Sequence, residues 1–242
     1  SNANRLVGIH FFNPVAKMDL VEVVSSSKTS KKVELNSCAF VNQIGKLPLP
    51  VKSSPGFLVN RVLMPYLMEC VQLLDEGYSA ETIDEAALSF GMFMGPVELA
   101  DTVGLDVGLA VAENLTGHFG GTVPQKLRDM VKEGKLGRKT GQGLYQYKNG
   151  KPIKKQPNTP IDPHIADRLI LRMVNESAAC LREGVVADAD LLDAGMIFGT
   201  GFAPFRGGPM NYAKDFGTNN LENLFKTLES KYGERFKVDE SL

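Results

Sequence analysis

Cysteine is scarce in this sequence, and its scarcity excludes two kinds of scaffold. The 242 residues include three cysteines, Cys38, Cys70 and Cys180, which lie far apart and form no C-x-x-C pair. Three isolated thiols exclude a disulfide framework and a cysteine-based zinc site, and they favour a reducing compartment. We expect all three side chains to act as packing groups.

Long apolar runs and an excess of one charge are also absent. The longest apolar stretches, GFLVN and RVLMPYLM, fall well short of the roughly 20 residues that a bilayer crossing needs. Lysine and arginine total 27 and aspartate and glutamate total 28, which leaves a formal charge of −1. We therefore expect no membrane span and no binding of nucleic acid or other polyanions.

Phosphate-binding and metal-binding motifs are missing as well. The nearest string to a dinucleotide G-x-G-x-x-G is GTGFAP at 199–204, which ends in proline and follows a helical pattern. The sequence has no GxxxxGK[ST], no HExxH and no paired-histidine spacing. If the protein uses a nucleotide cofactor, most of the phosphate contacts come from residues outside this sequence.

What the sequence does contain begins with an α/β segment. Ser1-Asn2-Ala3 resembles the remnant of an expression tag, and a strand pattern follows almost directly, so we expect a piece of a longer chain. Runs rich in Val and Ile predict strands at 5–12 and 19–24, and LPLPVK predicts an edge strand because proline cannot donate to a ladder. Residues 4–52 therefore read as β-β-α-β, the end of a larger sheet.

The helix between the second and third strands is predicted from Ser30 as its cap to Gly45 as its end. Its expected buried stripe consists of Val33, Cys38, Phe40 and Val41.

Helical patterns replace strand patterns after Pro55-Gly56. Pro55 predicts the first turn of a helix that runs to about Glu76. Further helices are expected from a cap at Ser79, from Pro96, from a cap at Asp106, from Pro124 and from Asp162-Pro163. The basic, Gly/Pro-rich stretch from Gly137 predicts a surface loop that passes into a linker at 151–160.

The two helical blocks form an internal repeat. RVLMPYLMECVQLLDEG at 61–77 aligns with RLILRMVNESAACLREG at 168–184, an offset of 107. IDEAALSFG at 83–91 aligns with LLDAGMIFG at 191–199, and Pro96 with Pro204, at 108. Because the helix breakers align as well as the apolar positions, we infer two units of one ancestry.

His10 is the strongest candidate for chemistry. It lies at the end of the first predicted strand, and Glu22 lies in the next strand, so neighbouring strands would bring the imidazole and the carboxylate together. Such a carboxylate fixes the tautomer of the imidazole and stabilises its protonated form. On spacing alone, a packed core histidine and a solvated edge-strand glutamate are the favoured interpretation, and the catalytic pair is the alternative. Asn60, predicted in the first helical turn, could support the histidine or only help to start the helix.

Four ordered motifs carry a family resemblance. GIHFFNPVAKMDLVEVV, PGFLVNRVLMPYLMECVQLLDEG, MGPVELADTVGLD and GRKTGQGLYQY resemble the L-3-hydroxyacyl-CoA dehydrogenase family from about Leu6 to Tyr147. The second repeat, with FGTGFAPFRGGPMNYAKDFG, resembles the duplicated C-terminal unit of the multifunctional fatty-acid oxidation enzymes.

The resemblance implies a mainly α fold. Tandem duplicated helical C-terminal domains would follow a truncated remnant of a Rossmann-type NAD-binding domain. The expected division is a tag remnant at 1–3, the NAD-binding remnant at 4–53, a helical domain at 54–150, the linker and a second helical repeat at 161–242.

The resemblance also implies residue roles in the NAD-dependent oxidation of 3-hydroxyacyl-CoA to 3-oxoacyl-CoA. His10 matches the catalytic base, Glu22 its orienting carboxylate and Asn60 an amide that supports histidine and substrate. Asn13 and Lys139 match contacts to NAD, and Tyr212 matches an acyl-CoA contact. The second repeat has Asp167 in place of Asn60 and no evident histidine partner, so we expect it to be structural.

Partners and alternatives follow from the same resemblance. A fatty-acid β-oxidation enzyme would add upstream NAD-binding and enoyl-CoA hydratase domains and could contact a thiolase beta subunit, in the cytoplasm if bacterial and in a mitochondrion or peroxisome if eukaryotic. Without the glycine-rich loop, we expect this chain alone to be inactive. The alternatives are a non-catalytic module for substrate covering and assembly, or a reductive 3-hydroxybutyryl-CoA dehydrogenase, which the double repeat argues against. We also predict that the repeats pack about a pseudo-two-fold axis through their long helices.

Overall fold

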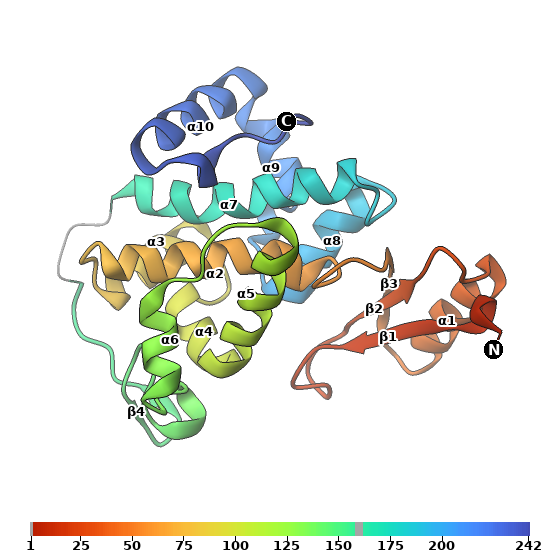
Figure 1. The fold of residues 1–242 in the computed structure, drawn as a ribbon, viewed down its shortest axis with the longest axis horizontal. Helices are drawn as coiled ribbons and strands as arrows, with labels where there is room; N and C mark the ends of the chain where they lie inside the picture. Colours follow the sequence, from red (N-terminus) through yellow and green to blue (C-terminus); the bar gives the residue numbers. More distant parts are fainter. Residues whose placement is uncertain (1, 158–161) are drawn as a thin grey trace.

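The computed structural model describes residues 2–157 and 162–242 and places a small N-terminal sheet beside a larger helical body (Figure 1). The sheet consists of β1 (Val7–Phe11), β2 (Leu20–Ser25) and β3 (Leu47–Lys52) in that order. β1 runs antiparallel to β2, and β3 runs parallel to it. The two strands predicted from Val and Ile and the proline-containing edge strand are confirmed.

The two faces of the sheet have different partners, because successive side chains point to opposite sides. Helix α1 (Lys31–Gln43) covers one face, where Val21, Val23 and Val41 form a small core. The other face, which includes Leu49 and Val51, joins the main core of the helical body. β2 therefore lies between two cores, and all six of its residues are buried.

The predicted stripe of α1 was wrong at one position. Ser30 does precede the helix, but its side chain makes no capping hydrogen bond. Phe40 is 47% exposed, at the side of an open groove that it lines with Val7 and Ile9 of β1.

The helical body contains two blocks in chain order. The first consists of α2 (Val59–Asp75), α3 (Ala80–Phe90), α4 (Pro96–Val103), α5 (Leu105–Phe119) and α6 (Gln125–Lys132). The second consists of α7 (Pro163–Arg182), α8 (Ala189–Thr200), α9 (Pro209–Phe216) and α10 (Thr218–Tyr232). Short 3-10 turns lie at Ala3–Arg5, Arg138–Thr140, Pro204–Arg206 and Glu234–Phe236.

Two predicted helix starts were wrong. α2 begins at Val59 and not at Pro55, because the Glu22 carboxylate accepts the N–H groups of Leu58 and Val59 and so sets the first turn. α5 begins at Leu105 after Gly104. Asp106 lies inside α5, where its carboxylate binds the Lys139 amine instead of capping the helix.

The predicted surface loop after α6 is more ordered than expected. The Asp101 carboxylate accepts the N–H groups of Leu144 and Tyr145, both at 2.8 Å, and the Tyr145 ring is buried. A hairpin of β4 (Tyr147–Lys148) and β5 (Lys151–Pro152) follows, and it takes up the first two residues of the predicted linker. Residues 158–160 of that linker lie outside the described residues.

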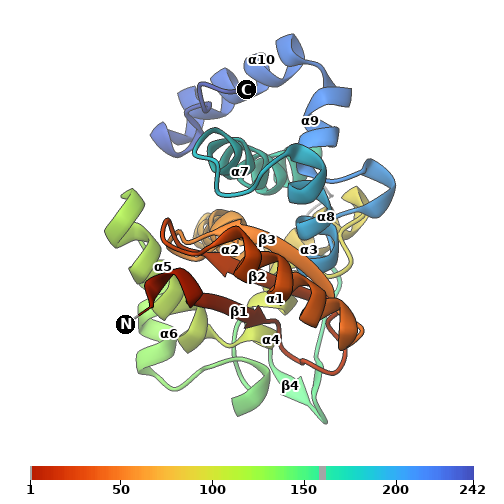
Figure 2. The same ribbon diagram turned by 90° about the vertical axis from the view of Figure 1, so that its right-hand side faces the viewer.

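The long helices of the two blocks lie side by side (Figures 1 and 2). Arg61 on α2 binds Glu176 and Glu183 on α7, and Arg168 on α7 binds Glu69 and Glu76 on α2. Each of these partners lies 107 residues from its counterpart. This exchange is the signature of a pseudo-two-fold axis between α2 and α7, as the repeat predicted.

A second contact shared by the two blocks corrects the alignment of one proline in the repeat. The Asp84 carboxylate accepts the Val97 N–H at the start of α4, and Asp193 does the same for Met210 and Asn211 at the start of α9. The proline that opens α9 is Pro209, so Pro209 and not Pro204 corresponds to Pro96.

Candidate active site

His10 and Glu22 lie directly opposite each other on β1 and β2. The His10 Nδ1 and the Glu22 Oε2 are 2.7 Å apart. The Glu22 side chain is fully buried, whereas that of His10 is 30% exposed. The predicted contact is confirmed, and the imidazole has one side toward the carboxylate and another toward solvent.

The second carboxylate oxygen of Glu22 binds the helical body. Its Oε1 accepts the N–H groups of Leu58 at 2.9 Å and Val59 at 3.0 Å. This oxygen therefore acts as the acceptor for two N–H groups at a helix N-terminus. An ionised carboxylate only accepts hydrogen bonds, so the proton of a neutral His10 ring belongs on Nδ1. The other nitrogen, Nε2, is then free to accept a proton.

Two aromatic rings flank the imidazole. The Phe12 ring lies edge-on to it at 4.7 Å between centroids, and the Phe57 ring lies at 5.3 Å. Phe57 has a φ of 53°, a left-handed conformation that costs free energy for a residue with a side chain. Sequence reasoning did not identify either phenylalanine as part of the site. Their positions within the HFFNP and PGF strings were the available signal.

Asn60 lies in the same turn that Glu22 caps. It is the second residue of α2 and is half-buried. No hydrogen bond joins its amide to another residue in the described part of the chain. The first turn of α2 thus brings Asn60 close to the dyad, and its amide is uncommitted.

The other predicted contacts lie at different places. Asn13 is exposed three residues beyond His10, at the end of β1. The Lys139 amine lies on the helical body, 2.5 and 2.7 Å from the two carboxylate oxygens of Asp106. Tyr212 is half-buried against Phe90, with ring centroids 5.1 Å apart. Among the described residues, no hydrogen bond, ion pair or ring contact connects Lys139 or Tyr212 to the dyad.

The second block contains a histidine and carboxylate pair that the sequence reasoning missed. His164 Nδ1 lies 3.5 Å from Asp167 Oδ2, one turn along α7. The expectation that Asp167 has no histidine partner was therefore wrong. Burial raises the pKa of the Asp167 carboxyl, but the His164 side chain is 66% exposed. This pair is a local contact at the helix surface and lacks the buried carboxylate of the dyad.

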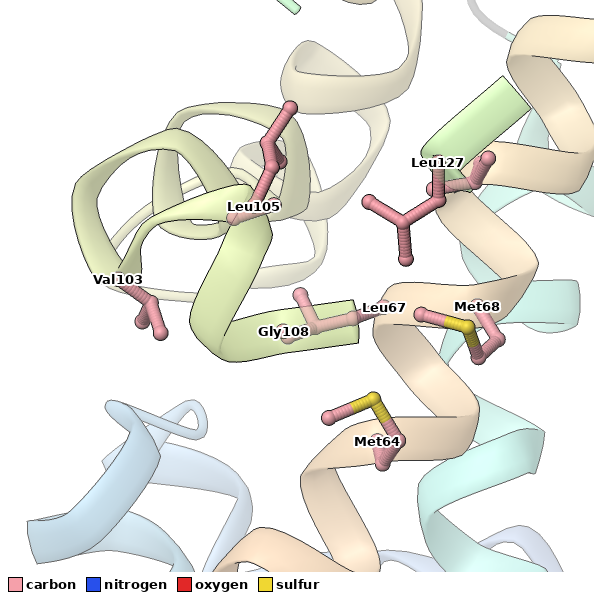
Figure 3. A pocket seen from close by; sticks show the side chains of 9 residues that line it. Met64, Leu67, Met68, Val103, Leu105, Gly108 and Leu127 are labelled. Atoms are coloured by element: carbon pink, nitrogen blue, oxygen red, sulfur yellow. The ribbon is translucent and has the colours of Figure 1, made fainter. Parts of the chain in front are cut away.

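A small apolar cavity lies elsewhere in the first block. It is lined by residues of α2, α4, α5 and α6, among them Met64, Met68 and Leu127 (Figure 3). Its volume is about 20 Å³, room for roughly one water molecule, and its lining is wholly apolar. This cavity is a packing gap and has no group for acid–base chemistry.

The described residues contain neither a membrane-spanning helix nor a metal-binding cluster. No helix there is long and apolar enough to cross a membrane. No cluster of three or more histidine, cysteine or acidic side chains there could hold a metal ion.

Two sequence families match the chain. Residues 1–54 match the family described as 3-hydroxyacyl-CoA dehydrogenase, NAD binding domain, and residues 56–147 match 3-hydroxyacyl-CoA dehydrogenase, C-terminal domain. The boundary between the two matches falls in the turn that leads into α2.

Known proteins match over nearly the whole chain. A fatty acid oxidation complex subunit alpha from Shewanella sp. (strain ANA-3) is 37% identical over 98% of this chain, which spans 36% of that relative. The crystal structure of 3-hydroxybutyryl-CoA dehydrogenase from Escherichia coli matches 99% of this chain and 70% of its own, at 25% identity and a TM-score of 0.82. The dehydrogenase part of multifunctional enzyme 1 from C. elegans matches 98% of this chain and 58% of its own, at 27% identity and a TM-score of 0.68. The chain thus spans about a third of the length of the curated relatives it matches.

Proposed function

The chain belongs to the 3-hydroxyacyl-CoA dehydrogenase family, and on that premise we propose that it carries the general base of an NAD-dependent oxidation of 3-hydroxyacyl-CoA to 3-oxoacyl-CoA. The observation that carries the proposal is the contact of 2.7 Å between His10 Nδ1 and the buried Glu22 carboxylate. This contact leaves Nε2 as the proton acceptor on a half-exposed ring at the edge of the sheet.

The proposed oxidation needs a general base that accepts a proton near neutral pH. Oxidation of a secondary alcohol requires removal of the hydroxyl proton as the hydride leaves, and imidazole is suited to that task near neutral pH. His10 takes the 3-hydroxyl proton at Nε2. Glu22 then stabilises the imidazolium, since its buried charge lies directly behind Nδ1. Phe12 and Phe57 pack against the ring and help to keep it in one orientation.

Polar groups around the base would hold the substrate and the cofactor. In this proposal the free amide of Asn60 donates to the 3-oxygen or the thioester carbonyl, and Tyr212 is a more distant acyl-CoA contact. When bound, NAD accepts the hydride. The exposed amide of Asn13 suits its nicotinamide end, and Lys139 would reach it from the helical body after leaving Asp106. This chain contains no glycine-rich phosphate cradle, so only contacts at the nicotinamide end are assigned to it.

We further propose the division of the chain into an NAD-binding part at 4–53 and helical units at 54–150 and 161–242. The name of the Shewanella relative supports assembly into a larger complex, and we propose a thiolase-type subunit as the partner. The bacterial sources of such relatives favour a cytoplasmic setting.

The test joins the chain to the NAD-binding segment of a relative and follows NAD reduction with 3-hydroxyacyl-CoA. We expect His10→Gln to lower kcat by about 10³-fold, because general-base catalysis is lost. His164→Gln is the matched control, since that histidine is exposed on α7, and it should leave kcat unchanged. Full activity of His10→Gln would refute the proposal and favour a non-catalytic, substrate-covering module.

A second candidate function is the reverse reaction, the reduction of 3-oxobutyryl-CoA to 3-hydroxybutyryl-CoA. The E. coli 3-hydroxybutyryl-CoA dehydrogenase matches both helical blocks of this chain, so the double repeat does not argue against this reading as the sequence suggested. The ratio of forward to reverse kcat/KM across acyl chain lengths decides between the two. A preference for reducing four-carbon substrates would establish the second candidate.

A further inference from the structure

Arg61 links the second block of helices to the turn that supports the dyad. Its side chain is 3% exposed and lies one residue beyond Asn60 in α2. Its Nε donates to Glu176 at 2.6 Å, and its Nη1 and Nη2 donate to the two oxygens of Glu183 at 2.7 and 3.0 Å. Paired N–H to carboxylate bonds of this kind fix direction as well as distance. The start of α2 is therefore held by α7.

The same arginine also holds the chain just before α2. Its Nη1 donates to the Ser54 hydroxyl at 3.2 Å, and its backbone N–H donates to the Gly56 carbonyl at 3.3 Å. Phe57, the left-handed residue whose ring lies against His10, is enclosed between these contacts. A strained conformation persists only where its surroundings hold it.

Arg61 and Glu22 thus both form hydrogen bonds with the turn that leads into α2. Glu22 accepts the N–H groups of Leu58 and Val59, whereas Arg61 anchors Ser54 and Gly56 and is itself anchored on α7. If the arginine were released, the turn could shift, and the Glu22 carboxylate and the Phe57 ring would shift with it. Both of these groups contact the imidazole.

We propose that Arg61 is a positioning residue, through which Glu176 and Glu183 of α7 fix the orientation of the His10–Glu22 dyad. The inference rests on the proposed function, and it gives the second block a part in catalysis beyond covering the substrate. Arg61 itself contacts neither His10 nor Glu22.

The pseudo-two-fold axis supplies a matched control. The Glu76 carboxylate binds Arg168 as the Glu183 carboxylate binds Arg61. Each glutamate is the C-cap residue of its helix, Glu76 of α2 and Glu183 of α7. Glu76 lies about 22 Å along α2 from Arg61, at 1.5 Å per residue. Removing either carboxylate breaks the same kind of ion pair, between a buried arginine and a more exposed glutamate, but of the two glutamates only Glu183 supports the turn beside the dyad.

The kinetic test compares Glu183→Ala with Glu76→Ala in the chain joined to an NAD-binding segment. We expect Glu183→Ala to lower kcat by about tenfold with a smaller change in KM, because a misplaced base slows the chemical step. Glu76→Ala should lower the melting temperature by a similar amount and leave kcat within about twofold of the parent. Equal kcat values for the two variants would overturn the proposal.

A spectroscopic test on the 242-residue chain needs no turnover. The Nδ1–H of His10, hydrogen-bonded to a buried carboxylate, should give a far-downfield proton resonance, assigned by its loss in His10→Gln. We expect Glu183→Ala to shift or broaden this resonance and Glu76→Ala to preserve it. An unchanged resonance in Glu183→Ala would overturn the proposal. An inactive parent enzyme would refute the proposed function alone, because the resonance still decides the role of Arg61.

Discussion

Glu22 shows how the site depends on single atoms. One of its oxygens contacts His10 and the other accepts two backbone N–H groups of α2, so one buried side chain sets both a tautomer and a helix start. The sequence could predict the first contact, because strand pairing places residues opposite each other. It could not predict the second, because the partners lie 36 and 37 residues away and offer only backbone groups.

Gly108 offers a residue-scale test of helix stability. It lies inside α5 beside the apolar cavity, and a Cβ added there would meet no atom within 4 Å. We expect Gly108→Ala to raise the free energy of unfolding by about 0.5–1 kcal/mol, because alanine restricts the unfolded chain and favours helix. Urea denaturation would measure it.

The matched comparison is Gly104→Ala at the start of the same helix. Gly104 has a φ of 102°, which alanine adopts only with strain, so this change should destabilise the protein. Stabilisation by both changes would contradict the assigned backbone geometry.

Asp239 gives a pH-dependent prediction. The Arg182 guanidinium lowers the pKa of the Asp239 carboxyl to about 2. Because the folded value lies below the unfolded value of about 3.9, the pair stabilises the protein above that pH and is lost as the pH falls toward 2. We expect Asp239→Asn to cost about 1 kcal/mol at pH 7 and much less near pH 2.5, after allowance for solvent screening.

Denaturation of both proteins at several pH values would measure this difference. Arg182→Met should remove the same dependence, since it removes the cause of the low pKa. A difference that stays constant from pH 7 to pH 2.5 would rule out the assignment.

At the scale of elements, local chemistry predicted helices better than it predicted their starts. Ser79, Pro96, Pro124 and Asp162 mark observed starts, because each acts through neighbouring residues. α2 departs from its local signals because a carboxylate from β2 caps it. The loop after α6 was misjudged for a similar reason, since Asp101 holds its backbone from α4.

The aspartate caps of α4 and α9 are a testable element of the repeat. Asp193 is 6% exposed and accepts the N–H groups of Met210 and Asn211. The Gly208 backbone lies so close that a Cβ added to it would be 2.3 Å from the Asp193 Cβ. We expect Asp193→Ala to cost about 2 kcal/mol, because two N–H groups at the start of α9 lose their acceptor. Urea denaturation would measure the loss.

Asp190→Ala is the control, because Asp190 is exposed in the first turn of α8. It should change the free energy of unfolding by less than about 0.5 kcal/mol. An equal cost at the two positions would mean that Asp193 has no special role at α9.

At the scale of the whole molecule, the repeat predicted the arrangement of the blocks but not the bonds between them. The aligned breakers predicted two related units and an axis through α2 and α7. The reciprocal pairing of Arg61 and Arg168 was not predicted, because charged residues inside a long helix are most often solvated. Contact between the helices buries both arginines and gives them their carboxylate partners.

Arg168 tests whether the two blocks unfold together. Its side chain is 1% exposed and binds Glu69 and Glu76 across the axis. We expect Arg168→Met to cost about 3 kcal/mol, because Glu69 stays buried and, within the described part of the chain, keeps an ion pair with Arg235 alone. Circular dichroism in urea suits this measurement, since the chain has no tryptophan.

The parent should show one unfolding transition that moves as a whole in the variant. Lys226→Met, which removes an exposed pair with Glu222, should cost less than about 0.5 kcal/mol. Two separate transitions in the parent would show that the blocks are independent.

The bond from Glu22 to the first turn of α2 has a mechanical consequence. The carboxylate joins the sheet to the helical body at the same side chain that contacts the base. Two bonded parts are displaced least, relative to each other, at the point where they are bonded. Strain between the sheet and the helical body therefore disturbs the contact between His10 and Glu22 less than it disturbs residues far from this bond.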